Sequence, residues 1–384
     1  MNTGFRQIVV QFSLCMAIGC AVTELIAADR IILRNLEIIS DRTVLAFEDD
    51  GVTLDAAWND GSKQIGWDEI ERATISKNLQ EEFDARLKEL GTPLFRIRQR
   101  LRIGDYAGLR EPAEALYPRF AARKSETAYR VCQAMMWSRL AHGDREGAVE
   151  PYLRCFEQLR SRAAKISAIP GERRLQVDPK TGFSPELMAV WFDASAAKRA
   201  LPAVKEAWDA MQQPPPAAAA VYYATLAMTA GENAEADKVL AGLPTDSAVV
   251  AQWRQVARAQ AEVLAGQSGP HVAVLRQQRN ALAESTRPAA IYWLGMAALQ
   301  AEDEAAQQDC VLELLSLPAV YGKPAPELAA AGLYQSMLAL DKLKDDVGSA
   351  AIRKELLQNY AATAHAAKVR AAATPTGVQT ATIP

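Results

Sequence analysis

From about residue 78 onward, short stretches of helical hydrophobic periodicity are separated by corners built mainly from Gly, Asp and Glu. Apolar residues recur with the 3.6-residue period of an amphipathic helix rather than the two-residue period of a strand. The corners are Gly104-Asp105, Gly143-Asp144, one near Ser195, Gly231-Glu232, Gly266, Glu302-Asp303 and Lys344-Asp345. Successive corners are 39, 52, 36, 35, 36 and 42 residues apart. Because a lone helical hairpin cannot bury its apolar face, this repeat predicts a mainly α fold in which hairpins stack as an α-solenoid.

Small residues lie where the two helices of a hairpin would touch. Ala148 and Ala236 follow a corner, and Gly295 precedes one. Helix-ending prolines lie late in several units, at Pro118, Pro244 and Pro318. In these features the array resembles tetratricopeptide repeats, although Met136 and Leu109 stand where that family usually carries Gly or Ala. We therefore describe the predicted array as tetratricopeptide-like.

This resemblance implies a binding function. Tetratricopeptide arrays typically form an extended groove that holds peptides, extended segments or helices of partner proteins. The hairpins from Arg287 through Lys368 also resemble repeats of bacterial envelope-assembly factors.

The predicted array covers residues 78–370 and contains one insertion. Residues 166–184, within the longest gap between corners, carry the turn pairs Pro170-Gly171, Asp178-Pro179 and Thr181-Gly182, which predict a loop. Residues 371–384 are small, polar and Pro-containing, with little to bury, and we expect a disordered tail.

Residues 29–77 carry a strand pattern instead. The segments 30–39 and 43–47 are rich in β-branched residues, and Asp49-Asp50-Gly51 and Asn59-Asp60-Gly61 supply tight turns. The spacing of short strands and Gly turns resembles a small SH3-like or Sm-like barrel. Such a domain would bury little surface alone, so we expect it to pack on the helices that follow.

The N-terminus has the three-part layout of a secretory signal peptide. Arg6 precedes an apolar run from Ile8 to Ala21, and the small-residue exit Ile26-Ala27-Ala28 predicts removal of residues 1–28. Lipid attachment at Cys20 is an alternative, because the residues before it loosely resemble a bacterial lipobox. An uncleaved membrane anchor is another, since the run approaches the ~20 residues that span a bilayer. All three interpretations place the protein in the periplasm or the cell envelope.

The overall charge excludes some partners, and the sequence lacks familiar catalytic motifs. A formal net charge of -3 is not the basic footprint of a nucleic-acid-binding protein. No Ser elbow, phosphate-binding loop or metal-ligand spacing occurs, and the three histidines are far apart. The sequence thus predicts no enzyme activity, no metal and no cofactor.

One arginine cluster could bind an anion. Its members are Arg96, Arg98, Arg100 and Arg102. On a helix, Arg96 and Arg100 share one face while Arg98 and Arg102 share a neighbouring one. An envelope polymer or an acidic partner surface would suit this patch. The alternative is a solvated face paired with nearby carboxylates, namely those of Glu89, Glu111 and Glu114.

Two cysteines could form a disulfide bond. Cys132 and Cys155 lie about equally far from the corner at Gly143-Asp144, on opposite helices of one predicted hairpin. An oxidising compartment would permit the bond, although helix axes ~8–10 Å apart exceed the Cα separation of about 7 Å that a disulfide tolerates. Simple core packing of the two thiols is the alternative.

The sequence as a whole predicts an exported scaffold or adaptor that binds a protein or peptide partner through a tetratricopeptide-like groove. Two other classes stay open. One is an envelope glycan-active enzyme that uses paired carboxylates. The other is a structural envelope component that assembles with itself.

Overall fold

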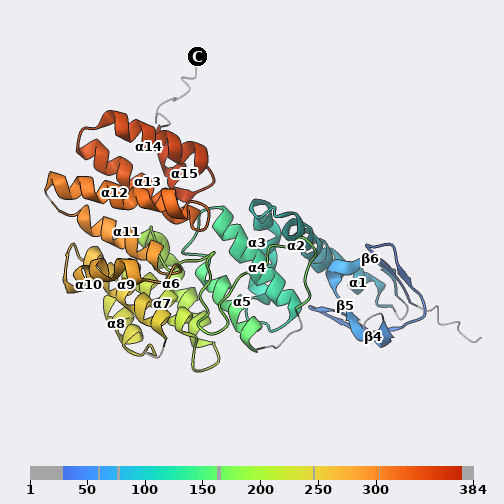
Figure 1. Cartoon of the computed structure of the whole chain (residues 1–384). Helices are drawn as coiled ribbons and strands as arrows, with labels where there is room; N and C mark the ends of the chain where they lie inside the picture. Colours follow the sequence, from blue (N-terminus) through green and yellow to red (C-terminus); the bar gives the residue numbers. More distant parts are fainter. Residues whose placement is uncertain are drawn as a thin grey trace, which may run out of the picture.

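The computed structural model describes residues 29–58, 61–75, 78–161, 166–244, 247–301 and 303–373. The chain is mainly α, with a small β region at its start, which we call the β module (Figure 1). Its strands are β1 Arg30–Leu33, β2 Ile38–Ile39, β3 Val44–Glu48, β4 Gly51–Trp58, β5 Ser62–Ile65 and β6 Ile70–Thr74. The prediction of a mainly helical fold behind a small β domain is confirmed.

The β module consists of two antiparallel three-stranded sheets, ordered β2-β1-β6 and β3-β4-β5. Asp49 and Asp50 form the predicted turn between β3 and β4, where Glu48 pairs with Gly51. Part of the second predicted turn, residues 59 and 60, lies outside the described residues. The β module packs against the helices as expected: the ring centroid of buried Trp67 lies 5.1 Å from that of Phe83 in the first helix.

The helices begin at Gln80. The first group is α1 Gln80–Arg86, η2 Leu87–Gly91, α2 Thr92–Ile103, α3 Arg110–Phe120, α4 Glu126–Ala141 and α5 Val149–Ser161. The second group is α6 Ala194–Asp209, α7 Ala217–Ala230, α8 Asn233–Ala241, α9 Ala248–Leu264 and α10 Pro270–Gln278. The last group is α11 Arg287–Ala298, α12 Glu304–Tyr321, α13 Pro326–Lys342, α14 Asp346–Asn359 and α15 Ala364–Ala373. The described part of the chain contains no helix that is long and apolar enough to cross a membrane.

The middle helices form antiparallel pairs that repeat. The first members of successive pairs, α7, α9, α11 and α13, pack against one another in a row, and each also packs against its own second member. The burial of side chains follows this arrangement. Nearly every residue of α7 is buried, whereas α8 buries only Ala236 and Leu240. An inner helix is therefore apolar all round and an outer helix is apolar on one face.

Most of the predicted corners are confirmed. Gly104, Gly143, Gly231 and Gly266 each follow a helix in the left-handed conformation, with φ between 72° and 91°, where a side chain would be strained. The expected corner near Ser195 is wrong, because α6 begins at Ala194 and no helix lies in the described segment before it. That segment, residues 166–193, includes the predicted loop.

The helical array curves, so that α15 near its end contacts the corner between α4 and α5. A methyl group added at Gly143, in the α4–α5 corner, would lie 2.9 Å from Cβ of Ala364 at the start of α15. Phe192, in the segment before α6, packs its ring edge-on against His365, with centroids 4.8 Å apart. Residues more than 170 positions apart in the sequence thus share one buried interface.

Several predictions concern residues outside the described ranges. They are the signal peptide at residues 1–28, with the alternative lipid site at Cys20, and most of the tail. Within the tail, residues 371–373 belong to α15, so the helix extends slightly beyond the predicted end of the array at residue 370.

Candidate binding groove

A hollow of about 610 Å³ lies where the β module meets the first helices, and we call it the joint groove. Several parts of the chain line it: Asp50 and Trp58 from the β3–β4 hairpin, strand β5 with the turn after it, helices α2 and α4, and the loop at residues 167–169. In Figure 1, β5 lies on the side of the module that faces these helices. A hollow between separate parts of a chain is a favoured place for a ligand.

The walls of the joint groove include apolar side chains. Ile65 from the module, Leu94 and Ile97 from α2, and Ile169 from the loop line it. Each is at most 8% exposed, because each also belongs to the core. This lining gives the groove apolar patches beneath a polar rim.

The rim carries more carboxylates than guanidinium groups. Arg98 pairs with Asp68 at 2.8 Å and with Glu69 at 3.5 Å. Arg130 pairs with Glu126 at 3.5 Å and with a further carboxylate, that of Glu172, at 2.8 Å. Two guanidinium groups thus pair with four carboxylates, so the net charge of this cluster is negative.

The pKa of Glu69 is raised in these surroundings. Burial raises the pKa of its carboxyl above the usual range, and the negative charges of Asp68 and Glu126 act in the same direction. Arg98 opposes the shift without cancelling it. A positive charge placed in the joint groove would therefore be attracted.

A free strand edge lies along the same groove. Within the described chain, β5 pairs only with β4, so its other side is an edge. The backbone N–H of Gln64 donates to the hydroxyl of Ser62 at 3.0 Å, and that hydroxyl donates to the carbonyl of Gln64 at 3.0 Å. Both backbone groups of Gln64 are thus occupied by a neighbouring side chain instead of by a strand.

The predicted arginine cluster is not assembled into one site. Arg96 pairs with Glu111 at 3.8 Å, Arg100 with Asp105 at 3.0 Å, and Arg98 faces the joint groove. The described residues include no ion pair for Arg102, which lines a hollow of about 360 Å³ with Arg34 and Phe95. Three of the four arginines are salt-bridged, but only Arg96 pairs with a predicted carboxylate, that of Glu111. Anion binding stays a prediction.

One charge cluster that joins the β module to the helices could not be predicted from the sequence. Asp49, in the β3–β4 turn, accepts from Arg86 at 2.8 Å and also pairs with Arg119 and Arg123. These arginines hold the pKa of the Asp49 carboxyl below its usual range. We interpreted Asp49 only as a turn residue, because its partners are 37 and more residues away.

Cys132 and Cys155 lie where the prediction placed them, on α4 and α5, and both are buried free thiols in the structure. The Cys155 thiol donates to the carbonyl of Tyr129 at 3.8 Å. Burial raises the pKa of the Cys155 thiol, and its hydrogen bond with Cys132 adds to the shift. The two thiols are neighbours, and a disulfide between them stays a prediction.

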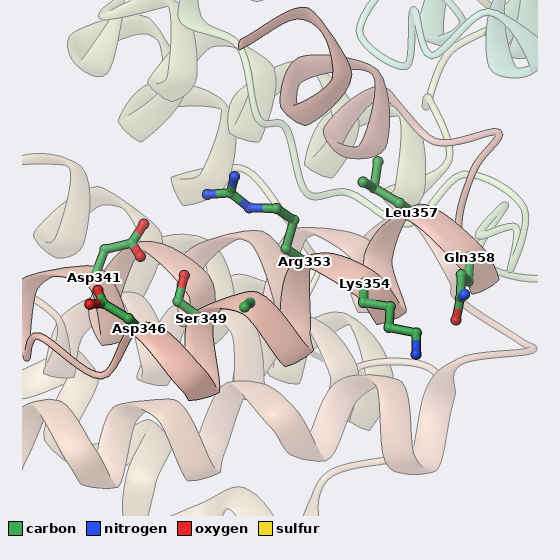
Figure 2. A pocket seen from close by; sticks show the side chains of 8 residues that line it. Asp341, Asp346, Ser349, Arg353, Lys354, Leu357 and Gln358 are labelled. Carbon is green, nitrogen blue, oxygen red and sulfur yellow. The ribbon is translucent and has the colours of Figure 1, made fainter. Parts of the chain in front are cut away.

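A second hollow, of about 590 Å³, lies along α14. Figure 2 shows Asp341 and Asp346 together at one end, Lys354 and Gln358 toward the other, and Arg353 between them. Its side chains are spread along a helix face and do not converge on a common point. The joint groove is therefore the better candidate.

Comparison with protein-family models, curated proteins and solved structures returned no match for this chain. Any function must therefore be argued from its own residues.

Proposed function

We propose that this protein is an exported, non-enzymatic scaffold that binds a protein or peptide partner in the cell envelope. Its helical hairpins, in this proposal, are tetratricopeptide-like. The row of α7, α9, α11 and α13, with left-handed glycine corners, supports that assignment. Export rests on the signal-like segment at residues 1–28.

The observation that carries the binding proposal is the joint groove. It combines apolar patches, an unbalanced rim of charge and a strand edge with backbone hydrogen-bonding groups. A polypeptide can use all three at once, since it has side chains of both kinds and its own backbone donors and acceptors. We therefore place the partner at the joint groove rather than along the helical array alone.

Site-specific photo-crosslinking in native cells tests this function. A p-benzoylphenylalanine side chain replaces exposed Ala168, which lines the joint groove, and a control replaces Val347 on α14, which is 82% exposed. We expect one protein, identified by mass spectrometry, to form a stoichiometric adduct at position 168 and not at position 347.

Other outcomes would contradict the proposal. Recovery of the bare protein from both positions, or of glycan alone, would reject the scaffold function and favour the enzyme or self-assembly alternatives. An adduct between two copies of this chain would favour self-assembly in particular.

A further inference from the structure

We propose that the partner binds by strand addition: an extended segment with a Lys or Arg side chain pairs with the free edge of β5 at Gln64. This inference deepens the proposed function and rests on it. It specifies which backbone groups are used and which charge the partner carries.

The backbone of β5 supports strand addition. The N–H and carbonyl of Gln64 both meet the Ser62 hydroxyl, a side chain of β5 itself, and we infer that neither group bonds to β4. In an antiparallel ladder, the two backbone groups of one residue point to the same side, and an incoming strand would bond to both. The Ser62 hydroxyl covers this edge in the free protein, which is one way that proteins protect exposed strands.

The length of the segment follows from the strand. β5 has 4 residues, and an extended chain rises ~3.3 Å per residue. A partner segment of about six residues would span this edge with one residue beyond each end. Its alternate side chains would face the apolar lining, including Ile65 and Ile97, and the charged rim.

The charge of the partner follows from the rim. The Arg98 and Arg130 guanidinium groups are already engaged with Asp68 and Glu172, both at 2.8 Å. Glu69 and Glu126 have longer contacts, at 3.5 Å, to the same two arginines. A cationic side chain would complete the pairing of these two carboxylates, whereas an anionic one would increase the existing repulsion.

The test uses hexapeptides as the probe. A phage-displayed hexapeptide library is selected on the purified protein, and the most enriched peptide is synthesised with acetylated and amidated ends. Fluorescence polarisation then gives its Kd. We expect enriched peptides to carry Lys or Arg, and replacing that residue by Glu to weaken binding by about tenfold or more.

Matched protein variants test the backbone contact. Gln64→Ala keeps the backbone N–H and measures the loss of the side chain alone. Gln64→Pro also removes the N–H and should bind about tenfold more weakly than Gln64→Ala. Ser62→Ala uncovers the edge and should tighten binding by a few fold, about the effect of one competing hydrogen bond. Replacing Glu69 and Glu126 together by Gln should remove most of the preference for Lys over Glu.

If Gln64→Pro does not fold, modified peptides test the same backbone contact on the wild-type protein. Methylation of single backbone nitrogens should abolish binding at alternate positions only, because alternate N–H groups face the strand edge. Strand addition would be overturned if the peptide bound wild type equally well whichever single nitrogen was methylated. Tighter binding of the peptide with Glu in place of Lys or Arg would also overturn it. The scaffold function would survive that result, since it is tested separately by the crosslink at position 168.

Discussion

At the scale of single residues, His365 shows how burial of one side chain links stability to pH. The imidazole is 2% exposed and packs against the rings of Phe192 and Tyr334. Burial lowers the pKa of His365 to about 3, and the positive charge of Lys368 adds to the shift. The unfolded chain has an ordinary histidine pKa of about 6.5. The contribution of neutral His365 to the stability of the folded protein is therefore fully present above pH 6.5. It is lost progressively as the pH falls toward 3.

We expect this single group to lower the free energy of unfolding by about 2 kcal/mol between pH 7 and pH 5. Urea unfolding at the two pH values measures the loss. His365→Phe keeps an aromatic ring and should lose correspondingly less, whereas the control His142→Phe, at an exposed position, should match wild type. Equal losses for wild type and His365→Phe would show that His365 is accessible to protons in the folded protein.

At the scale of elements, the corners between helices combine a local requirement with a tertiary one. Gly231 has φ of 91° and nothing within 4 Å of the position of a Cβ atom. Gly143 has a similar φ of 74°, but a Cβ atom there would lie 2.9 Å from Cβ of Ala364. Both glycines are required by backbone conformation, and only Gly143 is also required by packing.

We therefore expect Gly231→Ala to cost about 1 kcal/mol of unfolding free energy, from backbone strain alone. Gly143→Ala should cost about 1–3 kcal/mol more, because the added methyl group overpacks the contact with α15. Chemical denaturation of the two variants gives the difference. If they were equally destabilised, α15 would not press on the α4–α5 corner in solution.

At the scale of the whole molecule, a buried charge cluster joins the early corner to the later helices. Arg145 is 8% exposed and donates to the carbonyls of Val190, at 3.1 Å, and Met188. Glu327, near the start of α13, interacts electrostatically with Arg145, and burial raises the pKa of its carboxyl. The two residues are far apart in the sequence, so the approach of their charges depends on the curvature of the whole array.

A double-mutant cycle tests that connection. Arg145→Met should destabilise the protein by about 2–4 kcal/mol, because it leaves the carbonyls of Val190 and Met188 without their donor and removes a positive charge near Glu327. Glu327→Gln should be milder, and we expect the double variant to deviate from additivity by about 1–3 kcal/mol. Additive effects would mean that the two residues are independent and that the array is open in solution.

Local features of the fold could be predicted from the sequence because their causes are local. The change of hydrophobic period near residue 78 marks the change from strands to helices. Gly104, Gly143, Gly231 and Gly266 mark corners because few other residues tolerate a left-handed backbone. The predicted corner near Ser195 is wrong because it rests mainly on spacing and on a change from polar to small residues, without a glycine to mark it.

The candidate site was predictable only in part. Arg98 was singled out as a charged residue, but its partners Asp68 and Glu69 come from the β module, and Gln64 carried no signal at all. Periodicity and turn chemistry determine each element by itself. The curvature of the array and the docking of the module result from many small packing angles added together. Only the tertiary structure therefore decided which strand edge faces the groove and which ends of the array meet.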